Sequence, residues 1–120
     1  VAVELINAIY NNLGKEMVVN TRNNGAIHGF DDDAVVEINS LIDAQGARPL
    51  AFGALPPIMN GLTQQVKAFE RLTIEAAVHG CRDSALLALV SNPLVGNVTD
   101  ARALLDEVLT INRPWLTQFN

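Results

Sequence analysis

The stretch that decides the fold runs from Pro56 to Gly80 and reads PPIMNGLTQQVKAFERLTIEAAVHG. Its apolar residues recur every three or four positions, which places them on one face of a helix: Ile58, Leu62, Val66, Phe69, Leu72 and Ala76. Pro57 suits a first helical turn, where the missing N–H is not needed, and Gly80 suits the left-handed conformation that often ends a helix. The spacing therefore predicts one long amphipathic helix between Pro56 and Gly80.

An amphipathic helix must cover its apolar face, and the segment before it offers a candidate surface. Residues 35–43 alternate in polarity, as a half-buried strand does, with four residues facing one way: Val36, Ile38, Ser40 and Ile42. A turn at 44–47 and a return strand at 50–52 are expected next, with Pro49 at an edge position or a late strand start. The pattern predicts an α+β fold, in which a small antiparallel sheet packs against a long helix and further helices.

The remaining segments complete this outline. A helix over 1–13, a short β-prone run at 17–19 and an apolar segment at 26–30 precede the alternating strand. After Gly80 we expect a short helix over 83–89, stopped by Asn92 before proline, and a last helix with Thr99 as its N-cap. The C-terminal apolar residues are expected to fold back as an anchor: Trp115, Leu116 and Phe119.

Composition narrows the classes of function. The 120 residues suit one domain, and 49% hydrophobic residues suit a folded core. The net charge of −5 disfavours a nucleic-acid partner or an anionic membrane surface. A single cysteine excludes an intrachain disulfide and fits a cytoplasmic setting. No apolar run reaches the ~20 residues of a membrane span. The chain begins with Val1 inside a helical pattern, which suggests a piece of a larger protein.

No residue pattern by itself indicates catalysis. The chain has neither a dinucleotide-binding glycine motif nor a P-loop. His79 and Cys81 are close in sequence but supply two ligands at most, so a structural role is favoured over a metal site. His28 is interpreted as a loop residue, and the acidic run 31–33 as a solvated turn that lacks the other ligands of a calcium loop.

The segment from Asn20 to Gly25 is interpreted as a loop, and it is the one polar constellation that does not look like a turn signal alone. Arg22 suits bidentate contact with a phosphate or carboxylate, and the amides of Asn20 and Asn23 suit sugar hydroxyls. The alternative is that the asparagines cap turns and Arg22 pairs with a surface acid, which turn chemistry alone favours.

An ordered set of motifs gives a more specific indication. These are VVNTRNNGAI at 18–27, DDAVVEIN at 32–39, Pro49-Leu50 with GALP at 53–56, FERLTIEAA at 69–77, Arg82-Asp83, NPL at 92–94 and NRPWL at 112–116. Together they resemble the C-terminal domain of family-4 glycoside hydrolases, and within that family the 6-phospho-β-glucosidase branch. The resemblance spans nearly the whole chain in the family's order.

The resemblance implies a fold like that of lactate and malate dehydrogenases, with an NAD-binding Rossmann domain upstream of this segment. It also implies hydrolysis of a phosphorylated disaccharide by NAD-dependent oxidation, elimination, addition and reduction, with Mn²⁺ polarising the sugar oxygens. The family's nucleotide loop, metal ligands and base lie upstream of the matching region. No catalytic, cofactor-binding or metal residue is therefore expected in this chain, and substrate contacts are expected from Asn20, Arg22 and Asn23.

Two hypotheses of different classes follow. In the first, the chain is the C-terminal part of a 6-phospho-β-glucosidase and is inactive alone; in the second, it is a stand-alone interaction or oligomerisation module with no catalysis. The equivalent domain of a lactate or malate dehydrogenase is a third, disfavoured by the motif at 69–77. Apolar surface left by a missing domain predicts a homo-oligomer. Cys81 stands where the family usually has an aspartate, and as a helix cap it is the poorer residue.

Overall fold

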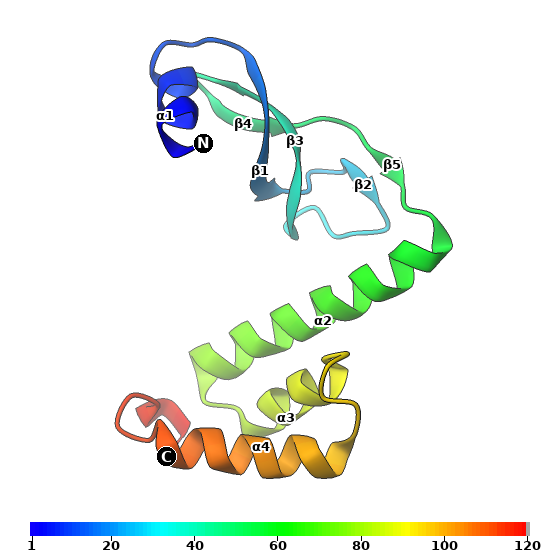
Figure 1. Cartoon of the computed structure of the whole chain (residues 1–120), viewed down its shortest axis with the longest axis vertical. Helices are drawn as coiled ribbons and strands as arrows, with labels where there is room; N and C mark the ends of the chain where they lie inside the picture. The colour runs from blue at the N-terminus through cyan, green and yellow to red at the C-terminus, as the bar shows by residue number, and fades with distance from the viewer. Residues whose placement is uncertain (120) are drawn as a thin grey trace. The chain divides into compact units, whose positions relative to one another are not determined.

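A computed structural model describes residues 1–119 and divides them into two compact units, which separate between Pro56 and Pro57 (Figure 1). The first unit contains every strand and the second is built of helices, so the predicted α+β class with a small antiparallel sheet is confirmed. Each unit has its own packing and is described by itself. The predicted packing of the long helix on the strands stays a prediction.

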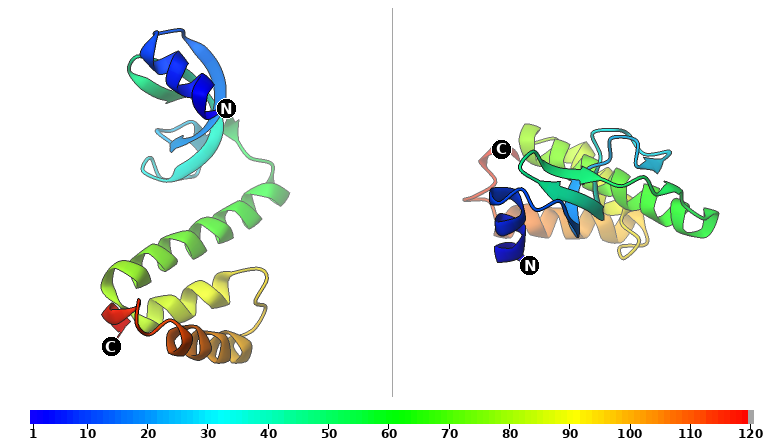
Figure 2. Two further views of the ribbon diagram at one scale, coloured as in Figure 1. Left: turned by 60° about the vertical axis from the view of Figure 1, so that its left-hand side comes forward. Right: turned by 90° about the horizontal axis from the view of Figure 1, so that it is seen from above.

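The first unit consists of one helix and two small sheets. Its elements are α1 (Ala2–Tyr10), β1 (Lys15–Arg22), β2 (Ile27–His28), β3 (Val35–Asp43), β4 (Gly46–Pro49) and β5 (Gly53–Ala54). The larger sheet is antiparallel with the strand order β1-β3-β4, and β2 pairs in parallel with β5. Helix α1 contacts β3, and Figure 2 shows it beside the larger sheet. Ala8 of α1 and Ile42 of β3 are both fully buried.

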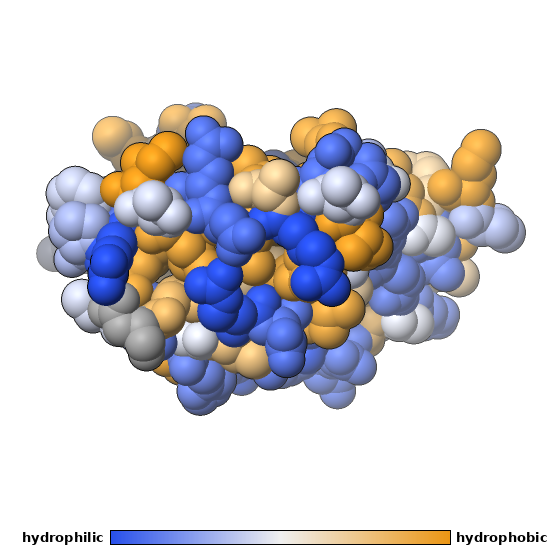
Figure 3. Space-filling view, turned by 90° about the horizontal axis from the view of Figure 1, so that it is seen from below, coloured by the Kyte–Doolittle hydropathy of each residue, from blue (hydrophilic) through white to orange (hydrophobic). Residues whose placement is uncertain are grey.

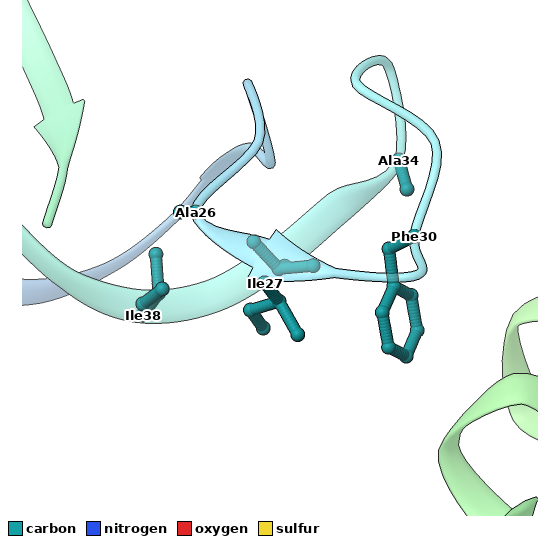
Figure 4. Close-up of a cluster of buried hydrophobic side chains, with 6 residues drawn as sticks. Ala26, Ile27, Phe30, Ala34 and Ile38 are labelled. Atoms are coloured by element: carbon teal, nitrogen blue, oxygen red, sulfur yellow. The ribbon is translucent and has the colours of Figure 1, made fainter. Parts of the chain in front are cut away.

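Strand β3 confirms the predicted alternation. Val36, Ile38, Ser40 and Ile42 are buried, and Val35, Glu37 and Asn39 between them are exposed. The buried side joins one apolar cluster, drawn in Figure 4 and made up of Ala26, Ile27, Phe30, Ala34, Val36 and Ile38. The loop residues of this cluster lie next to β3 because β2 and the turn after it fold back over the strand. This packing fixes the course of the chain between β1 and β3.

The return strand lies elsewhere than predicted. It is β4, at Gly46–Pro49, whereas 50–52 is not a strand. Asp43 pairs with Gly46, which leaves a two-residue loop, and Gly46 has φ +100°, a conformation open to glycine. The prediction that Pro49 is at an edge is confirmed, since β4 is an edge strand. Phe52 instead donates its backbone N–H to the carbonyl of Ala26 at 2.8 Å, toward β2.

The second unit begins with the long helix, which is confirmed almost to the residue. Its elements are α2 (Pro57–His79), α3 (Arg82–Ser91), α4 (Val98–Ile111) and the 3₁₀ turn η1 (Thr117–Phe119). Helix α2 contacts α3 and η1, and α3 contacts α4. Of the predicted apolar face, Ala76 is buried and Val66, Phe69 and Leu72 are half-buried, whereas Ile58 and Leu62 are exposed. Asn92 ends α3 in an extended conformation before proline, as predicted.

Two details of the second unit differ from expectation. The N-cap of α4 is Asn97 and not Thr99, because the Asn97 Oδ1 atom accepts the Asp100 N–H at 2.8 Å. Trp115 is 77% exposed and is not part of an anchor. Leu116 and Phe119 are half-buried, and Gln118 Nε2 donates to the Ala77 carbonyl at 3.0 Å, so the C-terminal segment does fold back onto α2.

Candidate functional site

The predicted polar loop is in fact the end of a strand followed by a tight turn. Asn20 and Arg22 belong to β1, and only Asn23 onward leaves the sheet. The turn lies at Asn24 and Gly25, which have φ values of +45° and +78°. These two residue types adopt positive φ most readily, so the local sequence accounts for the turn. The earlier interpretation of 20–25 as one loop is therefore corrected.

Asn23 is the structural centre of this region. Its side chain is fully buried, and its amide nitrogen donates to the carbonyls of Ile27 and Phe30, both at 3.1 Å. Its amide oxygen accepts the Ile27 N–H at 2.7 Å. Every polar atom of the side chain is thus occupied within the loop. Asn23 shapes the turn, as the alternative interpretation held, and its amide has no free hydrogen for a ligand.

Asn20 and Arg22 lie on the exposed face of β1, which we call the outer sheet face. The register pairs Asn20 with Glu37 and Arg22 with Val35, both exposed residues of β3. Directly paired residues have Cβ atoms about 5 Å apart, and residues two apart along a strand are separated by about 7 Å. Asn20, Arg22 and Glu37 therefore form one polar patch on the outer sheet face.

The side chains of this patch have no partner among the described residues. Within residues 1–119, Arg22 makes no ion pair or hydrogen bond, and the same holds for the side chains of Asn20 and Glu37. An unpaired guanidinium binds the oxygens of a phosphate in a bidentate manner. The amide and the carboxylate are suited to hydroxyl groups. The predicted alternation over 35–43 leaves Glu37 opposite to the buried residues of β3, but its pairing with Asn20 is visible only in the strand register.

The histidines and the cysteine lie apart from this patch in the fold. His28 is exposed on β2, and His79 is the last residue of α2. Cys81 is the N-cap of α3, where its Sγ atom accepts the Ser84 N–H at 3.5 Å and lies 3.2 Å from Ser84 Oγ. The hydrogen bond from the Ser84 hydroxyl, followed by that from its N–H, holds the pKa of the Cys81 thiol below its usual range. Cys81 thus has a structural role as a helix cap, whereas the structural role of His79 stays a prediction. His28 lies on strand β2 and not in a loop, which corrects its interpretation from the sequence.

The residues that could bind a metal do not assemble. In the part of the chain that the structure describes, no three His, Cys, Asp or Glu side chains gather as a metal site would require. None of the helices in the same range has the length and apolar character of a bilayer span.

Comparison with known proteins decides the family. Residues 1–95 match the model of the family 4 glycosyl hydrolase C-terminal domain. The chain belongs to this family. The resemblance seen in the motifs is thereby confirmed.

The curated proteins that this chain resembles are named as enzymes that act on phosphorylated glucosides. A probable 6-phospho-beta-glucosidase of Bacillus subtilis is 47% identical over 118 residues, which cover 98% of this chain and 27% of that protein. A 6-phospho-beta-glucosidase of Thermotoga maritima is 39% identical over 115 residues, covering 96% of this chain and 28% of that protein. The chain thus spans little more than a quarter of the length of these relatives.

Solved structures of such enzymes contain the same fold. The Thermotoga maritima 6-phospho-beta glucosidase, solved with manganese, NAD⁺ and glucose-6-phosphate, matches with a TM-score of 0.87 at 39% identity, over 96% of this chain and 28% of that one. A 6-phospho-alpha-glucosidase from gut microorganisms, solved with NAD and glucose-6-phosphate, matches with a TM-score of 0.91 at 31% identity, over 95% of this chain and 26% of that one. Relatives with either anomeric preference therefore share this domain.

Proposed function

We propose that this family 4 domain is the C-terminal, substrate-side part of a 6-phospho-β-glucosidase. The enzyme would hydrolyse 6-phospho-glycosides by NAD-dependent oxidation, elimination, addition and reduction, with Mn²⁺ as Lewis acid. The observation that carries the proposal is the 47% identity to a probable 6-phospho-beta-glucosidase over 98% of the chain. The cofactor, the metal and the base would belong to an upstream Rossmann domain; in support, this chain covers only 28% of the Thermotoga maritima enzyme that was solved with manganese and NAD⁺.

The contribution of this chain would be to hold the phosphorylated sugar. Arg22 would bind the phosphate, and Asn20 would bind hydroxyl groups on the same outer sheet face. Asn23 would act indirectly, because its three hydrogen bonds fix the turn that directly follows Arg22. The domain thus supplies recognition, whereas the redox chemistry would take place on the upstream domain.

Activity measurements on two proteins test this proposal. The 120-residue chain, given a chromogenic 6-phospho-β-glucoside with NAD⁺, Mn²⁺ and a reductant, is expected to show no turnover. The longer protein that contains it is expected to cleave the same compound and to lose activity without NAD⁺. Turnover by the 120-residue chain, or inactivity of the longer protein towards both anomers, would overturn the proposal. The second outcome would favour a non-catalytic module.

The role of Arg22 is tested in the longer protein. Arg22→Gln removes a charge from an exposed strand residue, so folding should be preserved. Loss of one charge-assisted contact is expected to raise KM about tenfold or more for the 6-phosphorylated glucoside, with kcat changed less. Arg48→Gln on β4 is the matched control, since Arg48 pairs with Asp43 instead. Equal KM values for the two variants would show that Arg22 does not bind the phosphate of the substrate.

We also propose that the protein forms homo-oligomers. Helix α1 exposes a row of apolar side chains, with Val3 79%, Ile6 65% and Tyr10 86% accessible. Contiguous apolar surface of this kind marks association sites. Light scattering should give at least twice the monomer mass, and a monomer mass would contradict the proposal.

A further inference from the structure

The second unit contains an apolar hollow of about 300 Å³ among its helices. Its walls come from four elements and include Phe69 and Ala76 of α2, Ala88 of α3, Leu105 of α4 and Phe119 of η1. The hollow is open to solvent on one side, and water in such an apolar space finds few hydrogen-bond partners. A volume of about 300 Å³ is at the lower end of the range of small-molecule sites.

The lining offers almost nothing polar to a ligand. Thr73 is the single polar residue among the lining side chains of the described chain, and its hydroxyl already donates to the Phe69 carbonyl at 2.8 Å. Ala76, Ala88 and Leu105 are each less than a tenth exposed, so the deep wall is firmly packed. The hollow therefore suits a hydrocarbon group and excludes a sugar, whose hydroxyls would lose their hydrogen bonds to water.

A second hollow of about 370 Å³ adjoins the first and is polar. The two share Leu109, Leu116 and Phe119, and the second is otherwise lined by polar groups of α3, α4 and the segment after α4, among them Arg82 and Arg113. Figure 3 looks onto this unit from the side of α4, where strongly hydrophilic residues stand among apolar ones. The apolar space thus continues into a mouth that carries guanidinium groups.

The charge at the mouth is positive, although the chain as a whole carries −5. Arg82 pairs with Asp106 at 2.7 Å, which leaves Arg113 as the uncompensated charge. Arg113 makes no ion pair or hydrogen bond with any of residues 1–119. Asp106 is the only carboxylate among the lining side chains described, so an anion would meet a net positive field. An amine at this position would be repelled by the uncompensated guanidinium group of Arg113.

We propose that the two hollows form one site for an amphipathic anion, with a short hydrocarbon tail between the helices and a carboxylate head at Arg113 and Arg82. The tail replaces water that the apolar walls hold poorly, and the carboxylate accepts bidentate hydrogen bonds from a guanidinium group. A neutral apolar molecule would use the first hollow and leave Arg113 unused. The site lies wholly within the helical unit and does not depend on the proposed glycosidase function.

The test is calorimetric titration of the 120-residue chain with octanoate, 1-octanol and octylammonium, below the concentrations at which they aggregate. Octanoate is expected to bind saturably at one site, octanol more weakly, and octylammonium not at all. Arg113→Gln is expected to weaken octanoate binding about tenfold and to leave octanol binding unchanged. Arg48→Gln in the first unit removes the same charge elsewhere and should change neither.

A second variant tests the tail pocket separately. Ala85 lines the apolar hollow only, and Ala85→Leu would fill part of it. This variant should weaken octanoate and octanol alike, with circular dichroism confirming that the helices remain. The proposal is overturned if octylammonium binds as tightly as octanoate, if Arg113→Gln and Arg48→Gln behave alike, or if octanoate shows no saturable binding at millimolar concentrations. The comparison of the three ligands and the Arg113→Gln variant test the proposed site even if Ala85→Leu fails to fold.

Discussion

The hydrogen bonds of the buried Asn23 amide allow the most direct test of what stabilises the first unit. Asn23→Ala would leave the Ile27 N–H without an acceptor and would deprive the carbonyls of Ile27 and Phe30 of a donor. An orphaned buried donor costs about 1–3 kcal/mol, and each lost hydrogen bond to a carbonyl about 0.5–1.5 kcal/mol. The expected loss is therefore about 2–6 kcal/mol, a large part of the roughly 5–15 kcal/mol that stabilises a domain.

Native-state hydrogen exchange measures this loss where it occurs. The backbone N–H of Ala26 donates to the Asn23 carbonyl at 2.9 Å, and that of Gly53 donates to the Ala26 carbonyl at 3.0 Å. Both amides should exchange much faster in Asn23→Ala, while amides of α4 keep their rates. Asn20→Ala, on the exposed face of β1, is the matched control and should change stability by less than about 0.5 kcal/mol.

The reasoning fails if Asn23→Ala costs less than about 1 kcal/mol, because buried groups would then have found other partners. Asn23→Asp provides a second test of the same hydrogen bonds. It keeps an acceptor for the Ile27 N–H but turns a carboxylate oxygen toward two carbonyl oxygens. It should destabilise the loop more at pH 7 than at low pH, where the acid is protonated and can donate. A stability independent of pH would show that the side chain is solvated.

Three further outcomes concern the helical unit. Gly80→Ala should lower the free energy of unfolding by more than about 1 kcal/mol, because Gly80 has φ +68° and an added Cβ would lie 1.7 Å from a backbone oxygen of the C-terminal segment. Gly61→Ala is the control in the same thermal unfolding experiment. Its added Cβ meets no atom within 4 Å, so it should be neutral or stabilising. The Cys81 thiol should react with iodoacetamide at a lower pH than a free thiol, because Ser84 stabilises the thiolate. Ser84→Ala should move the midpoint of the pH–rate profile to higher pH, and an unchanged midpoint would contradict this cause. Asn97→Ala should cost about 1 kcal/mol through loss of the N-cap, as measured by urea unfolding, and a loss below about 0.3 kcal/mol would show that the first turn is capped otherwise.

The features that the sequence alone determined depend on interactions between residues that are close together in the chain. The long helix and strand β3 follow from apolar spacing, and the end of α3 follows from the steric clash of proline with the residue before it. The family could also be inferred, because its motifs are short segments whose order is visible without any structure. Asn20 and Arg22 were identified as candidates on residue type, although not as members of a strand.

What only the tertiary structure decided depends on groups distant in the chain. Whether 46–49 or 50–52 forms the return strand depends on the loop geometry and on competing hydrogen bonds to Ala26. The pairing of Asn20 with Glu37 depends on strand register, and the burial of Asn23 depends on carbonyls supplied by the folded loop. The mouth at Arg113 exists because α3, α4 and the C-terminal segment meet there. Periodicity reports which face of an element is apolar, whereas its partner is chosen by packing and hydrogen bonding across the whole unit.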